Sequence, residues 1–296
     1  MSLRLAVTGL TGLVVSALIE RAPRDVEIIA LGRPQLDLGV RGAVLASLRH
    51  AGCDAIVNAA AYTQVDKAES EPERAMLVNG VGAGNVAEAA AELDAPLLHL
   101  STDYVFDGAL DRPYREDDPT RPLTAYGRSK LAGEERIAAR HQNCLILRTA
   151  WVYSPFGVNF VKTMPRLGAE RDEVRVVADQ WGNPTNALDI ADALFALARR
   201  LVADPSPNLR GVFHLAGSGE ATWADVAERT FAVAERLGRK PVRVKRITTA
   251  DYPTPARRPA NSRLDTAKLG ENFGLSAPPW RDSLENCVVR LVSSSR

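Results

Sequence analysis

The chain of 296 residues contains only three cysteines, Cys53, Cys144 and Cys287. They are far apart, odd in number and not at the spacing of metal ligands, so the sequence predicts neither a disulfide framework nor a cysteine-ligated metal centre. Two of them lie in or beside apolar, strand-like runs. Buried thiols in a reducing cytosol are the ordinary interpretation of this pattern.

The chain also lacks any grouping of its four histidines with one another or with cysteine. His99 and His214 lie in apolar runs typical of strands, whereas His50 and His141 lie at the ends of predicted helices. We therefore expect all four to be structural, and no metal site is predicted.

Long hydrophobic runs and an excess of one charge are missing as well. No apolar run approaches the ~18 residues of a membrane span, and the first residues lead straight into a strand without the pattern of a signal peptide. Lys and Arg number 37 against 36 Asp and Glu, which argues against bulk attraction to nucleic acid or acidic membranes. The sequence predicts a soluble, cytoplasmic protein with either one large domain or one large domain and a smaller lobe.

Strands and helices alternate through the first half of the chain. Apolar runs predict strands at 3–8, 26–31, 54–58, 96–101 and 144–148, with helices between them. This β-α-β-α pattern predicts a doubly wound parallel α/β sheet of the Rossmann type. From about residue 170 the pattern changes to separate strands and helices joined by Pro-rich loops, which predicts a smaller C-terminal α/β lobe.

A glycine-rich turn, Gly9-Leu10-Thr11-Gly12-Leu13, follows the first predicted strand. Such a turn lets the backbone approach a pyrophosphate, and the next helix offers its N-terminal N–H groups. The fuller motif has a third small residue where this chain has Val15. The turn favours dinucleotide binding, and a tight structural turn is the alternative.

Two further stretches lie where a dinucleotide would be contacted. The second strand ends at Gly32-Arg33, and an arginine there accommodates the extra phosphate of NADP, whereas an acid favours NAD. Arg33 thus favours NADPH and leaves NADH open, although a solvated surface arginine fits equally well. Ala59, Ala60 and Ala61 leave the third strand as small residues, which suits either a cofactor or packing against a helix.

The chemistry-bearing stretch runs from Ser101 to Lys130. Thr102 lies where the fourth strand ends, the edge at which open α/β sheets bind ligands. Tyr126 and Lys130 are four residues apart on a helix predicted to begin near Ala125, so they share one face. An ammonium group beside a phenol favours the ionised phenol, and such a tyrosine can act as acid or base near neutral pH. The combination indicates a reductase.

Two other features indicate ligand contacts less specifically. Trp151 lies at the exit of the fifth strand, where its ring would stack on a sugar or base or simply belong to the core. Arg257 and Arg258 lie in a Pro-rich loop, where they would clamp a diphosphate or be solvated.

Six segments together carry a family resemblance: 58–72, 101–108, 126–134, 148–153, 179–185 and 252–259. In this order and at these distances, the chain resembles the extended short-chain dehydrogenase/reductases and, within them, the dTDP-4-dehydrorhamnose reductase family. The resemblance covers nearly the whole chain. It implies NADPH-dependent reduction of the C4 keto group of dTDP-4-dehydro-L-rhamnose to dTDP-L-rhamnose, the last step of dTDP-rhamnose synthesis for cell-surface polysaccharide.

The resemblance also implies a role for individual residues. The catalytic residues would be Thr102, Tyr126 and Lys130. The cofactor would be bound by Gly9, Leu10, Thr11, Gly12, Leu13, Arg33, Asp37, Leu38, Ala59, Ala60, Ala61, Tyr126 and Lys130. The sugar nucleotide would be bound by Thr102, Asp103, Tyr104, Trp151, Arg257 and Arg258. The NADP-binding domain would comprise residues 1–150. Its core would continue to about residue 170 and include some later segments of the chain. Residues 151–296 would mainly form the substrate-binding lobe.

The chain departs from the family pattern at two places. Val15 replaces a glycine, so the first helix is expected slightly further from its strand, with cofactor binding retained. Some members are dimers linked by a metal at a carboxylate-rich contact, but here the first helix has a carboxylate only at Glu20 and the C-terminal segment offers mainly Glu285. We expect neither that metal nor that dimer, and a homodimer of another kind stays open.

Two alternative functions also stay open at this stage. One is a sister enzyme of the same fold: a nucleotide-sugar epimerase or dehydratase, or a reductase for another 4-keto sugar. Asp103 beside Thr102 offers the additional acid–base group that a dehydratase needs. The other is a non-catalytic, NADP-binding regulatory subunit, against which the complete Thr102, Tyr126 and Lys130 set argues.

Overall fold

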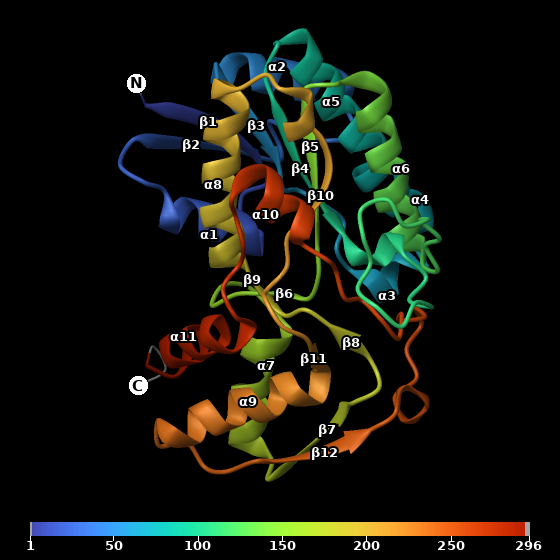
Figure 1. The fold of residues 1–296 in the computed structure, drawn as a ribbon, viewed down its shortest axis with the longest axis vertical. Coiled ribbons are helices and arrows are strands. Elements are labelled where there is room, and N and C mark those ends of the chain that lie inside the picture. The colour runs from blue at the N-terminus through green and yellow to red at the C-terminus, as the bar shows by residue number, and fades with distance from the viewer. Residues whose placement is uncertain (1, 294–296) are drawn as a thin grey trace.

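The computed structural model describes residues 2–293 and is built around a six-stranded sheet (Figure 1). All strands of this sheet run parallel, in the order β10-β5-β4-β3-β1-β2. Their bounds are β1 Leu3–Thr8, β2 Val26–Leu31, β3 Ala55–Asn58, β4 Leu97–Thr102, β5 Cys144–Thr149 and β10 Gly211–His214. The predicted fold class is confirmed.

Helices cover both faces of the sheet, which is why its strands are almost continuously apolar. Alternate side chains of β1 point to opposite faces, so Leu5 and Val7 belong to one core and Ala6 to the other. The first core is closed by α1 Leu13–Arg21 and α8 Ala187–Ala203. The second is closed by α2 Arg41–Ala51, α5 Gly82–Glu92 and α6 Ala125–Arg140.

The connections of β1 determine where a ligand can bind. The chain passes from β1 to β2 on one side and then crosses to β3 on the other side of β1. In open parallel sheets, ligands bind beyond the carboxyl ends of the strands at such a switch point. The turns that follow β1 and β3, at Gly9 and Ala59, both lie at this edge.

The helical segment between β3 and β4 contains one irregular part. It is made of α4 Pro72–Ala75, a π-helical segment η1 Met76–Val81, and α5. Helix α6 packs tightly against it, because a β-carbon at Gly133 would overlap the carbonyl oxygen of Asn79. This close contact fixes the position of the helix that carries Tyr126 and Lys130.

The smaller region lies beyond the carboxyl edge of the sheet, in the lower part of Figure 1. Strand β7 Glu173–Val177 pairs in parallel with β12 Arg243–Ile247, and α7 Phe160–Glu170, α9 Trp223–Arg236 and α11 Trp280–Ser293 pack together beside them. Four strands of two residues form two short sheets, β6 with β9 and β8 with β11. Their bounds are β6 Val152–Tyr153, β8 Trp181–Gly182, β9 Thr185–Asn186 and β11 Ala221–Thr222. Short helices complete the chain: α3 Val65–Ala68, α10 Ala267–Phe273 and the 3-10 turns η2 Asp103–Val105, η3 Pro207–Leu209 and η4 Thr249–Asp251.

The second half of the chain is shared between the two regions. Helix α8 packs on the sheet core and β10 forms the edge of the sheet, so residues 187–214 return to the sheet.

Within residues 2–293, no helix has the length and apolar character needed to cross a membrane. Cys53, Cys144 and Cys287 are all free.

Candidate active site

A cavity of about 900 Å³ opens at the switch point and extends to the smaller region. Most of the residues selected from the sequence line it: Gly9–Leu13, Arg33, Asp37, Leu38, Ala59, Ala60, Ala61, Thr102, Asp103, Tyr104, Tyr126, Lys130 and Trp151. Arg257 and Arg258 are not among the residues that line it. Segments separated by more than a hundred residues thus form one site.

The glycine turn after β1 fits a pyrophosphate. Gly9 has φ +104°, a backbone conformation that favours glycine, and a β-carbon there would lie 3.2 Å from Cγ2 of buried Val15. Gly12 caps α1 without a side-chain hydrogen bond, so the first-turn N–H groups are left for an anion at the cavity wall. Val15 therefore packs directly beneath the turn, and the residues present suit a dinucleotide cofactor.

The far end of this cavity is lined by Arg33, Asp37 and Leu38. Asp37 Oδ1 accepts a hydrogen bond from the Gly39 N–H at 2.9 Å, which orders the loop after β2. Arg33 is exposed while it lines the cavity. Its guanidinium is therefore free to meet a phosphate without breaking a buried contact.

Thr102 and Tyr126 are brought together by two local features. Thr102 ends β4, where its Oγ1 donates to Asp103 Oδ1 at 2.9 Å and accepts from the Tyr104 N–H at 3.2 Å. Helix α6 begins after Thr124, whose hydroxyl accepts from the Gly127 N–H at 3.0 Å. A β-carbon at Gly127 would overlap the Tyr104 carbonyl oxygen, so this glycine lets the first turn of α6 lie against the end of β4.

The ionisation of Tyr126 differs from the sequence-based expectation. Burial raises the pKa of Tyr126 above its usual value, its hydrogen bond with Thr102 opposes this, and Asp103 and Tyr104 raise the pKa further. Lys130 was expected to lower that pKa, but its Nζ donates to the Leu100 carbonyl oxygen at 2.6 Å and lies 3.2 Å from His99 Nε2. Tyr126 is therefore protonated at neutral pH and ready to act as an acid.

Two other groups in the site titrate near neutrality. Burial lowers the pKa of Lys130 to about 8, against the opposing charge of Glu134. Burial also raises the pKa of Asp103 to about 6, although hydrogen bonds from Ser262 and Thr102 oppose this. Asp103 Oδ2 is buried without a hydrogen-bond partner, and Asp103 is among the residues that line the cavity.

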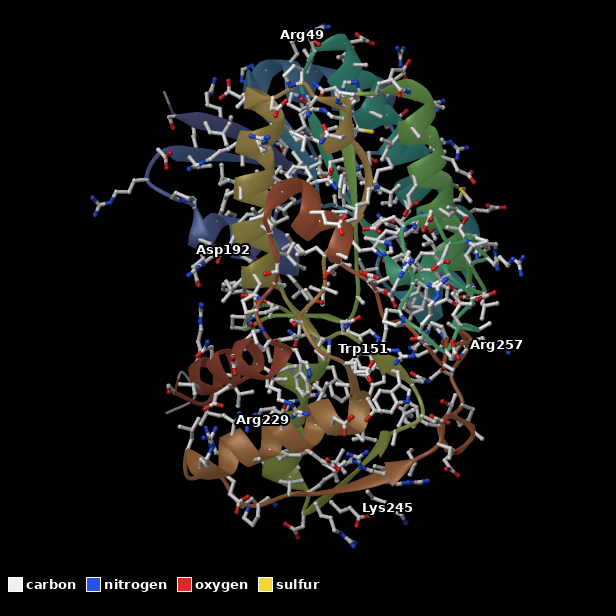
Figure 2. All side chains as sticks on the ribbon, in the orientation of Figure 1. Arg49, Trp151, Asp192, Arg229, Lys245 and Arg257 are labelled. Atoms are coloured by element: carbon white, nitrogen blue, oxygen red, sulfur yellow. The ribbon has the colours of Figure 1, made fainter. Side chains whose placement is uncertain are left out.

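The wall opposite the sheet is aromatic. Trp151 stacks on Trp223 with ring centroids 3.8 Å apart and planes 10° apart, and Phe160 tilts against Trp223 at 4.8 Å. Trp151 has φ +47°, an unusual conformation for a bulky residue, and Figure 2 shows it at the level where the two regions meet. The sequence did not reveal Trp223, because an aromatic residue at the start of an amphipathic helix is ordinarily a core residue.

The two loop arginines differ from each other. Arg258 Nη2 lies 2.7 Å from Asp66 Oδ2, and Arg258 Nη1 is buried without a partner. Burial raises the pKa of Tyr104 to about 12, and the positive charge of Arg258 opposes this rise. Arg258 is thus next to the cavity wall. Arg257 is exposed and lies at the outer edge of the molecule in Figure 2.

The carboxylates considered for a metal-linked dimer are engaged within the chain. Glu20 pairs with Arg290, and Glu285 pairs with both Arg229 and Arg236. Among residues 2–293, no group of three or more His, Cys, Asp and Glu side chains has the arrangement of a metal site.

Comparison with known proteins identifies the family. A sequence model described as "RmlD substrate binding domain" matches residues 3–293. The chain is 53% identical over 290 residues to the dTDP-4-dehydrorhamnose reductase of Sinorhizobium fredii, a match that covers 98% of each chain. The chain belongs to the dTDP-4-dehydrorhamnose reductase family.

Other dTDP-4-dehydrorhamnose reductases agree in sequence and fold. The enzyme of Escherichia coli is 46% identical over 245 residues, 82% of this chain and 81% of that protein. The crystal structure of the Bacillus anthracis enzyme in complex with NADP superimposes with a TM-score of 0.91 at 34% identity, covering 98% of this chain and 100% of that chain. The family predicted from the six sequence segments is confirmed.

Proposed function

We propose that the protein is an NADPH-dependent dTDP-4-dehydrorhamnose reductase that converts dTDP-4-dehydro-L-rhamnose to dTDP-L-rhamnose. The main support is one cavity that joins a pyrophosphate-binding turn to Thr102, Tyr126 and Lys130, in a chain that matches such reductases over nearly its whole length. This reaction completes dTDP-rhamnose synthesis for cell-surface polysaccharide.

The cofactor is proposed to lie along the sheet edge. The Gly9–Leu13 turn would hold its pyrophosphate, Arg33 the additional phosphate of NADPH, and the small residues Ala59–Ala61 would leave room between them. Asp37 and Leu38 would contact the adenosine, and Lys130 the nicotinamide ribose. When bound, NADPH supplies the hydride that reduces the sugar.

The protein supplies the proton and stabilises the developing charge. Tyr126, protonated because burial raises its pKa, would donate its proton to the C4 oxygen as the hydride reaches C4. The hydroxyl of Thr102 would donate a hydrogen bond to the same oxygen. One hydride and one proton convert the ketone to the alcohol, and the tyrosinate is then reprotonated.

The substrate is proposed to lie between the sheet edge and the aromatic wall. The unpartnered Asp103 oxygen and the Tyr104 hydroxyl would accept and donate hydrogen bonds with the sugar nucleotide, and Trp151 would offer a flat apolar face. For the diphosphate, Arg258 is better supported than Arg257 because its Nη1 has no partner and it lies beside Tyr104.

We further propose that residues 1–150 with later returning segments form the NADP-binding domain, and that 151–296 form mainly the substrate lobe. Free thiols at all three cysteines fit a cytoplasmic location, because reducing compartments keep thiols unpaired. Size-exclusion chromatography with light scattering distinguishes a monomer from a homodimer without a bridging metal.

The test of the function is the loss of NADPH absorbance on addition of dTDP-4-dehydro-L-rhamnose, with NADH in parallel. Stoichiometric oxidation with formation of dTDP-L-rhamnose is expected. NADPH binding without oxidation would contradict the proposal and favour a regulatory subunit or another keto sugar, and conversion of substrate without net NADPH consumption would favour an epimerase or dehydratase.

A further inference from the structure

A row of buried polar side chains crosses the otherwise apolar sheet behind the cavity. Thr8 on β1 stands opposite Asn58 on β3, and Asn58 stands opposite His99 on β4. Their exposed fractions are 0%, 2% and 1%. None of the three lines the cavity. Polar groups buried in this way are costly unless their hydrogen bonds are made, so the partners of the row are informative.

The row is continuous and ends at Lys130. Thr8 Oγ1 lies 2.7 Å from Asn58 Oδ1, Asn58 Nδ2 lies 2.9 Å from His99 Nδ1, and His99 Nε2 lies 3.2 Å from Lys130 Nζ. At the other end, the Ala60 N–H donates to Thr8 Oγ1 at 3.0 Å. The row therefore joins the backbone of the Ala59–Ala61 segment to the amine of Lys130.

His99 and a backbone carbonyl together orient the Lys130 amine. Lys130 Nζ donates to the Leu100 carbonyl oxygen at 2.6 Å and meets His99 on a second side. An ammonium has three N–H bonds. With two of them directed into the protein, the third is left for the cavity that Lys130 lines together with Tyr126.

The hydrogen positions in the row depend on the charge of Lys130. In the structure, the Asn58 amide nitrogen donates to His99 Nδ1, so the imidazole hydrogen is on Nε2. This Nε2–H donates to the Lys130 nitrogen. The nitrogen must then have a lone pair, so this arrangement requires Lys130 to be uncharged. A half-turn of the Asn58 amide brings its oxygen to Nδ1. Nδ1 then carries the hydrogen, and Nε2 accepts from the Lys130 ammonium.

We propose that His99, supported by Asn58 and Thr8, is a positioning residue that holds the Lys130 nitrogen at the cavity wall in both its charged and its uncharged form. Because the imidazole can change its tautomer and the Asn58 amide can make a half-turn, the Lys130 nitrogen need not move when Lys130 changes charge. The inference rests on the proposed function, in which Lys130 contacts the nicotinamide ribose beside Tyr126.

The surrounding groups allow such a change of charge near neutral pH. Lys130 is faced by Glu134 from its own helix, and Glu134 is paired with Arg148 of β5 at 2.7 Å. Tyr126 and Asp103 stand on the cavity side. Burial lowers the pKa of Lys130 to about 8, and burial and the Lys130 charge lower that of His99 well below its usual value. His99 therefore stays neutral while Lys130 changes charge, and only the position of its single ring hydrogen changes.

The first test compares His99→Phe with His99→Gln. Phenylalanine keeps the ring shape but neither nitrogen, so kcat is expected to fall about 100-fold, because small displacements of a catalytic group have effects of that size. Glutamine offers both a donor and an acceptor and is expected to restore kcat to within about tenfold of wild type. The matched control is His141→Phe, another buried histidine, whose Nε2 contacts only the Ala95 carbonyl oxygen away from the cavity.

The three variants separate positioning from folding. The midpoint temperature of thermal unfolding is expected to fall by a similar amount in His99→Phe and His141→Phe. Only His99→Phe is expected to have a lower kcat and weaker NADPH binding, the latter measured by fluorescence. Equal kcat in wild type and folded His99→Phe would overturn the inference, as would equal losses in His99→Phe and His99→Gln. A wild-type protein that does not reduce the sugar would instead overturn the proposed function.

The second test observes the tautomer without turnover. The protein has four histidines, so ¹⁵N-histidine labelling gives few signals, and His99→Phe assigns the one of interest. As pH rises through about 8, the value for Lys130, the His99 signals are expected to change from the Nδ1–H to the Nε2–H pattern. A single tautomer across that range, or a doubly protonated ring, would overturn the inference.

Discussion

The two regions that meet at the cavity contribute different kinds of groups. The sheet region contributes polar groups, such as Thr102 at the end of β4 and Lys130 on α6, each held by buried hydrogen bonds. The smaller region contributes rings: Trp223 stacks on Trp151, and Phe160 tilts against Trp223. On the proposed function, the sheet region performs the chemistry and the smaller region recognises the sugar nucleotide. Substitutions in the first should lower kcat, and substitutions in the second should raise KM.

The largest effect is expected for Tyr126→Phe in the sheet region. Loss of the proton donor should lower kcat about 1,000-fold while leaving NADPH affinity nearly unchanged, because general acid catalysis contributes factors of this size. Steady-state kinetics and NADPH fluorescence titration check this, with the exposed Tyr252→Phe as the matched control. Turnover equal to wild type would remove Tyr126 from the chemistry.

Asp103→Asn should reveal the cost of a buried carboxyl at the sheet edge. Because the pKa of Asp103 is raised to about 6, the folded state binds its proton more tightly than the unfolded state, so stability is lost as pH rises from about 4 to about 6. Relative to wild type, the variant should gain up to about 3 kcal/mol between those limits. Urea unfolding at several pH values measures this, and exposed Asp111→Asn should show no such change. A pH-independent difference for Asp103→Asn would contradict the account.

In the smaller region, Trp223→Ala should raise KM for the sugar nucleotide about tenfold with kcat almost unchanged, since an aromatic pair contributes about 1 kcal/mol beyond its buried area. Trp223→Phe keeps a ring beneath Trp151 and should show a smaller effect. Initial rates at varied substrate concentration make the comparison. A loss confined to kcat would show that the two regions do not divide the work in this way.

The smallest effect is expected for Arg33→Ala, because an exposed ion pair contributes at most about 1 kcal/mol. The preference for NADPH over NADH, measured as the ratio of kcat/KM values, should fall about fivefold. Arg24→Ala removes an exposed arginine that does not line the cavity and should leave the ratio unchanged. An unaltered ratio in Arg33→Ala would make Arg33 an ordinary surface residue.

The sequence predicted the sheet region well because its signals are local. Strands buried on both faces form apolar runs, Thr124 caps the helix that carries Tyr126, and the Gly9–Leu13 turn directly follows a strand. Each of these features is contained within a few residues. The position of the site then followed from the rule that ligands bind beyond the carboxyl ends of parallel strands.

What the sequence did not reveal depends on contacts between distant segments. His99 was interpreted as structural because only strand register brings it beside Asn58, 41 positions away, and only helix packing brings it to Lys130. Trp223 reaches Trp151 through the packing of α9. The two-residue strands carry no periodic pattern, and α10 and α11 were not predicted.

The most direct test of the central claim follows the hydride itself. NADPH carrying deuterium at the transferred position of the nicotinamide is incubated with the protein and dTDP-4-dehydro-L-rhamnose, and the product is analysed by NMR. The account predicts dTDP-L-rhamnose with deuterium at C4 and no label elsewhere in the sugar. An unlabelled product, or label at another carbon, would contradict reduction of the C4 keto group at this site.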